Sequence, residues 1–141
     1  REACRKHDNT PHIAFIRAVY MDEDPAIVKR DAEEAFRQFT AGNAAPTEDM
    51  PPKEELIAKG FPFYASGTLE RLAALSYEEL VEQRAIWAGT PEQVVEMNKE
   101  DLETCEGIAE IAFVPNFGGI EHWKACKTLQ LLAEKVIPHF R

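Results

Sequence analysis

Three apolar stretches, each followed by residues with helical spacing, organise the chain. They cover residues 13–21, 85–88 and 108–114. In the first stretch every position except Arg17 is apolar or aromatic, which is typical of a strand buried on both faces in a parallel sheet. Because strand and helix alternate three times, the pattern predicts an α/β fold in which helices cover a parallel sheet.

The helices carry start signals in the sequence. Asp24-Pro25 supplies an N-cap and a first-turn proline, and Thr90-Pro91-Glu92-Gln93 has the spacing of a capping box. Ser76-Tyr77-Glu78-Glu79 repeats that spacing before a short helix. The last helix is expected to bury one stripe, made of Ile120, Trp123, Cys126, Leu129, Leu132, Ala133, Val136 and Ile137.

The segment between Gly42 and Thr68 interrupts this alternation. It contains four of the nine prolines, and a short helical pattern covers residues 53–59. Long connections of this kind are commonly lids or insertions. The aromatic run Phe61-Pro62-Phe63-Tyr64 favours packing, either as a lid over a ligand or as a crossover that covers core. We therefore expect one domain over residues 1–141, with residues 42–68 as a lid-like insertion.

Composition narrows the range of partners. A chain of 141 residues with 45% hydrophobic content can form one domain with its own core. The formal net charge of −9 disfavours nucleic acid and anionic membrane, because both attract clustered Lys and Arg. The three cysteines lack the spacing of a disulfide framework, and no apolar run reaches the length of a membrane span. We expect reduced thiols and a cytoplasmic location.

Arg17 and the turn at Asn116-Phe117-Gly118-Gly119 are the first candidates for chemistry. A buried guanidinium needs a carboxylate, a ligand anion or water, so Arg17 either faces a ligand or forms a structural ion pair. The double glycine follows the third strand, where α/β proteins place ligands, and would let the backbone approach a planar ligand. The simpler alternative is a turn that needs positive φ at the glycines, with Asn116 capping it.

His122 stands four residues before Cys126, a spacing that permits metal binding, and Cys4, His7 and His12 lie close together near the start. Neither set has a fourth ligand at a helpful spacing, so we expect no metal. His122 is instead a candidate acid/base group that could reach the ligand face of the sheet. The alternative is an ordinary surface histidine at the start of a helix.

Four motifs follow one another along nearly the whole chain. They are Arg17-Ala18-Val19-Tyr20-Met21 with the acidic turn after it, Gly89-Thr90-Pro91-Glu92-Gln93-Val94, Asn116-Phe117-Gly118-Gly119 and Leu131-Leu132-Ala133-Glu134-Lys135-Val136-Ile137-Pro138. In order and spacing they resemble the carboxyl-terminal part of the luciferase-like flavin-dependent monooxygenases. Two departures are Glu121, where that family usually has proline, and Asn98-Lys99-Glu100, where its helix runs without interruption.

The resemblance implies the carboxyl-terminal portion of a (β/α)8 TIM barrel, with about three strand-helix units. It also implies reduced FMN, or a deazaflavin in some branches, which uses O2 to oxidise a small organic substrate, with a flavin reductase as a further partner. Asn116, Phe117, Gly118 and Gly119 would lie near the flavin ring or substrate, with Arg17 and His122 as the catalytic candidates. The insertion resembles the mobile loop that closes over reduced flavin in this family.

The first five units of such a barrel have no counterpart in the sequence, and residues 1–7 read like the end of a helix. Three strands cannot close a barrel. We therefore expect the chain to be inactive alone and to act within a longer parent, a homodimer or a complementary half-barrel. One alternative is a non-catalytic half-barrel remnant that assembles through its strand edges. Another is an unrelated small α/β binding module, for which the motif series would be a coincidence.

Overall fold

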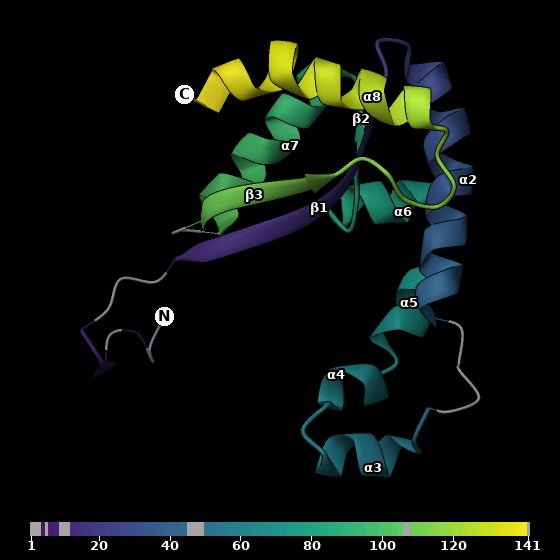
Figure 1. Ribbon diagram of the computed structural model, residues 1–141, viewed down its shortest axis with the longest axis vertical. Coiled ribbons are helices and arrows are strands. Elements are labelled where there is room, and N and C mark those ends of the chain that lie inside the picture. Colours follow the sequence, from purple (N-terminus) through teal and green to yellow (C-terminus); the bar gives the residue numbers. More distant parts are fainter. Residues whose placement is uncertain (1–3, 5, 9–11, 45–49, 106–107, 141) are drawn as a thin grey trace.

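Three strand-helix units form the framework, as the sequence predicts (Figure 1). A computed structural model describes residues 4, 6–8, 12–44, 50–105 and 108–140. The units are β1 (Ile13–Met21) with α2 (Pro25–Ala44), β2 (Trp87–Gly89) with α7 (Pro91–Thr104), and β3 (Ile108–Val114) with α8 (His122–Leu131). The predicted capping boxes are both formed, at Thr90 before α7 and at Ser76 before α6 (Tyr77–Glu82).

The three strands run parallel in the order β2-β1-β3. In a closed barrel each strand pairs with the next one in the chain, so β2 would lie between β1 and β3. Strand length gives a physical reason for the observed order, because β2 has three residues whereas β1 has nine and β3 has seven. Pairing the two long strands with each other satisfies more backbone N–H and C=O groups than pairing either with β2 alone.

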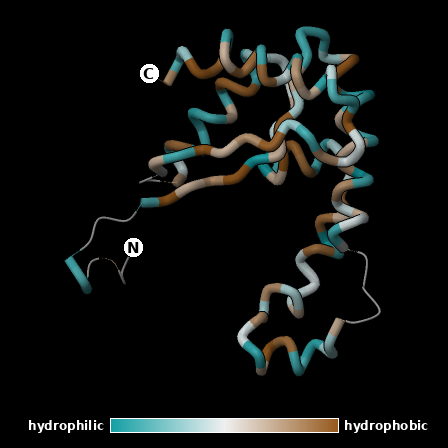
Figure 2. The backbone as a smooth tube through the Cα atoms, in the orientation of Figure 1, coloured by the Kyte–Doolittle hydropathy of each residue, from teal (hydrophilic) through white to brown (hydrophobic). Residues whose placement is uncertain are grey.

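The side chains of β1 alternate between two cores, one on each face of the sheet. Tyr20 packs in the first core, with α2 and with Ala125 of α8. Val19 and Met21 pack in the second, with α7 and with the residues that follow α8. Val19, Tyr20 and Met21 are thus buried on both faces, as the apolar run predicts, whereas Ala14 and Ile16 in the first half of β1 are exposed. Figure 2 shows apolar positions along β1 and β3 and on the helices near them.

The long helix α2 is amphipathic. Asp24 caps its start, since the amide of Ala26 donates to Asp24 Oδ1 at 2.8 Å. Ala32 and Phe36 are completely buried on one side, while Arg37 on the other side pairs with a neighbouring glutamate. α2 therefore has one side for the core and one for solvent. In the described part of the chain, no helix combines the length and apolar character that crossing a membrane requires.

α8 passes over the carboxyl end of β1. The amide of Met21 donates to Thr128 Oγ1 at 3.2 Å, and the Thr128 hydroxyl donates to the carbonyl oxygen of Met21 at 3.3 Å. Thr128 is completely buried, so both of its hydrogen bonds lie in the interior. The helix continues into a π-helical turn (Leu132–Val136) and a 3-10 turn (Ile137–Phe140).

The stripe predicted for the last helix is wrong in part. Trp123 is 60% exposed and Leu129 is 49% exposed, and Cys126 also faces solvent. The physical reason is that α8 contacts the end of β1 through the polar Thr128, which leaves these three side chains on the outer side of the helix. The prediction is confirmed at Ile120, Leu132 and Val136, which are buried, while Ala125, Thr128 and Leu131 are buried in place of the exposed positions.

The described part of the insertion contains two short helices, α3 (Lys53–Ala58) and α4 (Pro62–Ala65), and α5 (Thr68–Ala74) begins where the insertion ends. α5 packs against α2, whereas α3 and α4 pack against each other and extend away from the sheet (Figure 1). Phe61, Phe63 and Tyr64 are each at least half exposed, so these rings do not cover the core of this chain. A lid function for the insertion stays a prediction, and residues 45–49 lie outside the described residues.

Candidate functional site

The Gly118-Gly119 turn joins β3 to α8 by a backbone that only glycine adopts without strain. The φ angles are +54° at Gly118 and +77° at Gly119, and the amide of Ile120 donates to the carbonyl oxygen of Phe117 at 3.0 Å. A Cβ atom on Gly118 would stand 1.8 Å from the carbonyl oxygen of Ala35 in α2. The positive φ that the sequence suggests is therefore present, and Gly118 also serves close contact between the turn and α2.

The two residues before the glycines differ in exposure. Asn116 faces solvent. Phe117 is 4% exposed, and its ring stacks on Phe36 of α2 with ring centroids 4.3 Å apart. The edge of Phe39 meets the same ring at 5.9 Å. In this chain the Phe117 side chain therefore belongs to the core between α2 and the turn, and it anchors the turn to that helix.

A pocket of about 290 Å³ lies between α2, the turn and the start of α8. Its lining includes both glycines of the turn, Ala35 and Ile120. The charged lining consists of three carboxylates and two cations: Asp31, Glu34, Glu121, Arg30 and Lys124. The pocket therefore brings the turn next to a dense group of charges on α2 and α8.

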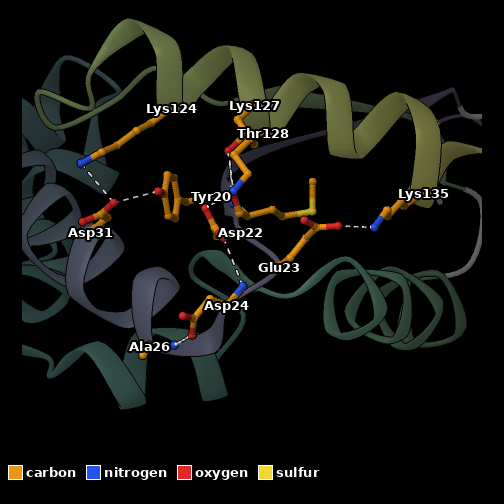
Figure 3. Close-up of polar contacts among 11 residues, drawn as sticks. Tyr20, Asp22, Glu23, Asp24, Ala26, Asp31, Lys124, Lys127, Thr128 and Lys135 are labelled. Carbon is orange, nitrogen blue, oxygen red and sulfur yellow. Dashed lines mark hydrogen bonds and ion pairs between the residues drawn. The ribbon is translucent and has the colours of Figure 1, made fainter.

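Asp31 is the centre of this charged group (Figure 3). Its Oδ2 accepts a hydrogen bond from the Tyr20 hydroxyl at 3.0 Å and lies 3.0 Å from Lys124 Nζ, while its Oδ1 lies 2.7 Å from Arg30 Nε. The pKa of Asp31 is lowered from 3.8 to about 2, and the hydrogen bond from Arg30 is the main cause. Burial raises this pKa, but the hydrogen bonds from Lys124 and Tyr20 lower it further. Burial raises the pKa of Tyr20 well above its usual value, and the hydrogen bond to Asp31 raises it further, so Tyr20 stays a donor.

The depressed pKa of Asp31 predicts a loss of stability in acid. The unfolded chain takes up the proton first, so the stabilisation is complete above about pH 4 and is lost as pH falls towards 2. One pKa unit corresponds to about 1.4 kcal/mol, so the shift stabilises the fold by about 2 kcal/mol. Urea unfolding of Asp31→Asn between pH 2 and 7 is expected to show a flatter stability profile than the wild type, with Tyr20→Phe between the two. Identical profiles for all three proteins would contradict this network.

A second set of charges fixes α8 over the carboxyl end of β1 (Figure 3). Lys127 Nζ lies 2.6 Å from Asp22 Oδ2, and the amide of Asp24 donates to Asp22 Oδ1 at 3.1 Å. Burial raises the pKa of Asp22, but the hydrogen bond from Lys127 and those from backbone amides outweigh it and lower the pKa below its usual value. Sequence reasoning missed this set, although the acidic run Asp22-Glu23-Asp24 and the lysines of the last helix were visible signals. The result is that α8, rather than open space, lies over the end of β1.

Arg17 forms an ion pair with α7. Its Nη2 lies 3.3 Å from Asp101 Oδ2, which also accepts a hydrogen bond from the indole N–H of Trp87 at 3.2 Å. The Arg17 guanidinium lies over the ring of Phe15, 4.5 Å from its centroid. The structure thus shows the ion-pair alternative for Arg17, on the face of β1 opposite Tyr20 and the core that contains Phe117. A catalytic role for Arg17 stays a prediction.

His122 is the first residue of α8 and faces solvent. Its Nε2 lies 3.4 Å from Cys126 Sγ, one turn along the helix. Among the described residues, no group of three His, Cys, Asp or Glu side chains is arranged to hold a metal ion. His122 and Arg17 are both absent from the lining of the pocket at the turn, so the structure does not bring the two catalytic candidates together there.

The residues around the turn do not by themselves fit a whole flavin nucleotide. A flavin phosphate needs free cations or amides, whereas Arg30 and Lys124 are already paired with Asp31, and the pocket has one more carboxylate than cations. The Phe117 ring is not available to stack on an isoalloxazine, because it packs against Phe36 and Phe39 and is only 4% exposed. The turn can form one wall of a site, and the remaining contacts would have to come from other residues.

The comparison with known proteins rests on structure. No protein-family model matches the sequence, and no curated protein matches it. A monooxygenase, RslO1 from Streptomyces bottropensis, is similar over 100% of this chain and 36% of its own, with a TM-score of 0.60 and 19% identity. A coenzyme F420-dependent tetrahydromethanopterin reductase from Methanopyrus kandleri is similar over 99% of this chain and 40% of its own, with a TM-score of 0.53 and 22% identity.

These two structures establish the fold class. The chain has an α/β fold that corresponds to a portion of the larger folds of these two proteins, as the prediction of a partial barrel requires, although its strand order differs from that of a closed barrel. It spans little more than a third of the length of either neighbour. At identities of 19% and 22% the likeness concerns the fold, and it leaves substrate and cofactor to be argued separately.

Proposed function

We propose that this chain forms part of a luciferase-like oxidoreductase that uses a reduced flavin or deazaflavin and O2 to oxidise a small organic substrate. The observation that carries the proposal is the similarity over 99% or more of the chain to a monooxygenase and to a coenzyme F420-dependent reductase. The four sequence motifs, which appear in the order expected for that family, support it independently. FMN is retained as a candidate because of the family resemblance of the sequence motifs, and F420 because the name of the second neighbour includes it.

Within this proposal the turn at Asn116-Phe117-Gly118-Gly119 forms one wall of the cofactor or substrate site. Its exposed residue Asn116 and the glycine backbone are the groups that can face a ligand, while Phe117 holds the turn in place. Arg17 and His122 are proposed to act only in the complete protein. Because the described residues do not build a flavin site alone, the rest of the site comes from a longer parent chain or from a partner.

Titration with flavin tests the proposal at two levels. The isolated chain of 141 residues is expected to bind FMN and F420, oxidised or reduced, more weakly than about 0.1 mM, because it supplies only one wall of the site. The protein isolated from its native source, with any chain that accompanies it, is expected to carry or bind one flavin or deazaflavin. Tight stoichiometric binding by the isolated chain would contradict the claim of incompleteness. A native complex that binds neither cofactor would contradict the function.

A second candidate function, a non-catalytic half-barrel that self-assembles, is favoured by an uncovered part of one sheet face, at the opposite end of β1 from Tyr20. Ile16 is 70% exposed and Val114 is 36% exposed, with Ala14 and Ala112 beside them. Apolar sheet faces and open strand edges of this kind promote association. Light scattering should then show a dimer or larger species that Ile16→Lys weakens and Ile57→Lys, on the exposed side of α3, does not. A monodisperse monomer would contradict this candidate.

A further inference from the structure

A second pocket, of about 330 Å³, lies between α7, β3 and the 3-10 turn at the end of the chain. We call it the α7–β3 pocket. It shares no lining residue with the pocket at the Gly118-Gly119 turn. Its volume lies within the range of about 300 to 1,000 Å³ that small-molecule sites occupy. Most of its lining is apolar and includes Leu102, Ile111, Phe113, Ile137 and Phe140.

Asn98 supplies the buried polar group of this pocket, whose lining also includes the exposed Glu110. Its side chain belongs to α7, lines the pocket and is 95% buried, since only 5% of the residue is exposed. Its Oδ1 is a buried oxygen that accepts no hydrogen bond from any described residue. Buried polar atoms in native proteins nearly always have a partner, because leaving one unpaired is costly. An unpaired amide oxygen on a residue that lines an apolar pocket therefore points to a bound molecule as its partner.

We propose that the α7–β3 pocket binds a small neutral molecule with an apolar body and one hydroxyl group that pairs with Asn98. The two ends of a carboxamide have nearly the same shape, so a half turn about the last side-chain bond exchanges oxygen and nitrogen. A hydroxyl both donates and accepts, so it satisfies whichever end faces the pocket. The apolar residues around it accommodate an aromatic ring or a short alkyl chain.

Charge at the rim excludes anionic ligands. Glu110 lines the pocket and is mostly exposed, and its Oε1 lies 3.4 Å from Nε2 of His12. A carboxylate or phosphate on the ligand would meet this negative group, whereas a neutral hydroxyl would not. Water alone is a poorer occupant, because an ordered buried water needs two to four polar partners and the inner lining offers Asn98 among aliphatic and aromatic groups.

The test compares two ligands that differ by one hydroxyl. Calorimetric titration of the full chain with 4-propylphenol and with propylbenzene is expected to show about tenfold tighter binding of the phenol. Asn98→Leu is expected to abolish that preference and to keep the affinity for propylbenzene, because leucine preserves the volume and the apolar walls. Asn43→Leu is the matched control and should behave as the wild type, since Asn43 is exposed on α2 and donates to the carbonyl oxygen of Phe39.

Three outcomes would overturn the site. They are equal affinity for the two compounds in the wild type, a preference for the phenol that persists in Asn98→Leu, and absence of binding of both compounds at millimolar concentration. Thermal melting of Asn98→Leu at or above the wild-type temperature confirms that the variant is folded. No flavin takes part in the experiment, so its result is independent of the proposed oxidoreductase function.

Discussion

Gly118→Ala is expected to destabilise the fold by about 3 kcal/mol or more. Two costs combine: the residue has φ of +54°, and its new Cβ would lie 1.8 Å from the carbonyl oxygen of Ala35. The atom it meets belongs to backbone in the middle of α2, so no flexible side chain can move away. The turn or the helix must shift, and the stacking of Phe117 on Phe36 would be disturbed with it.

Chemical unfolding followed by circular dichroism measures this effect, and two other glycines provide graded controls. Gly119 also has positive φ, but its Cβ would meet the flexible end of Gln38 at 3.1 Å, so Gly119→Ala should cost less, about 1 to 2 kcal/mol. Gly42 lies in the last turns of α2 with no atom near its Cβ, and Gly42→Ala should stabilise by up to about 1 kcal/mol. If Gly118→Ala stays within 1 kcal/mol of the wild type, the turn does not contact α2 closely in solution.

The same variant separates two reasons for the double glycine. A glycine needed for backbone geometry changes stability whether or not a ligand is present. A glycine needed only to let a ligand approach changes affinity and leaves stability nearly unaltered. The clash with Ala35 assigns Gly118 to the first kind, whereas the milder contact of Gly119 leaves room for the second.

Local patterns in the sequence were sufficient to predict the three strand-helix units, although β2 begins two residues later than the apolar run 85–88 and the short helices α4 and α5 were not predicted. The run of apolar residues gave β1 its observed bounds, and Thr90 and Gln93 form the capping box that their spacing indicates. These features depend on neighbours within a few residues, so the sequence contains all the required information. The positive φ of the two glycines was predictable for the same reason.

Contacts between distant segments were not predictable in this way. Three parallel strand patterns do not specify which strands pair, and the short β2 leaves β1 and β3 to pair with each other. Trp123 has the apolar character of a core residue, yet it is exposed because α8 contacts β1 through Thr128. Likewise, the sequence showed that Arg17 requires a partner but could not identify Asp101, which lies on another element.

Asp101→Ala is expected to destabilise the fold by about 3 kcal/mol. Asp101 is 7% exposed, and its Oδ2 accepts hydrogen bonds from Trp87 and Arg17. Removing the carboxylate leaves a completely buried indole N–H and a largely buried guanidinium without their acceptor. Urea unfolding followed by tryptophan fluorescence measures the loss, because Trp87 itself reports the change.

Two further variants complete the comparison: one removes the charge of Asp101 but keeps an acceptor oxygen, and the other removes an exposed carboxylate elsewhere on α7 as a control. Asp101→Asn keeps an acceptor oxygen of the same size, so it should lose about 1 to 2 kcal/mol. Glu96→Ala removes a solvent-exposed partner of Lys99 on the same helix and should change stability by less than about 0.5 kcal/mol. A loss for Asp101→Ala as small as that for Glu96→Ala would show that the buried pair is not formed in solution.

A double-mutant cycle between Arg17 and Asp101 then decides the role of the arginine. If the pair is structural, Arg17→Met and Asp101→Asn together cost less than the sum of the single losses, with a coupling of about 1 to 2 kcal/mol. If Arg17 instead exists to face a ligand, the coupling is near zero, and Arg17→Met stabilises the free chain by removing an uncompensated charge. The distance of 3.3 Å between Arg17 Nη2 and Asp101 Oδ2 favours the first result. Arg17 would then serve the proposed site by fixing α7 against β1, and a ligand would find it already paired.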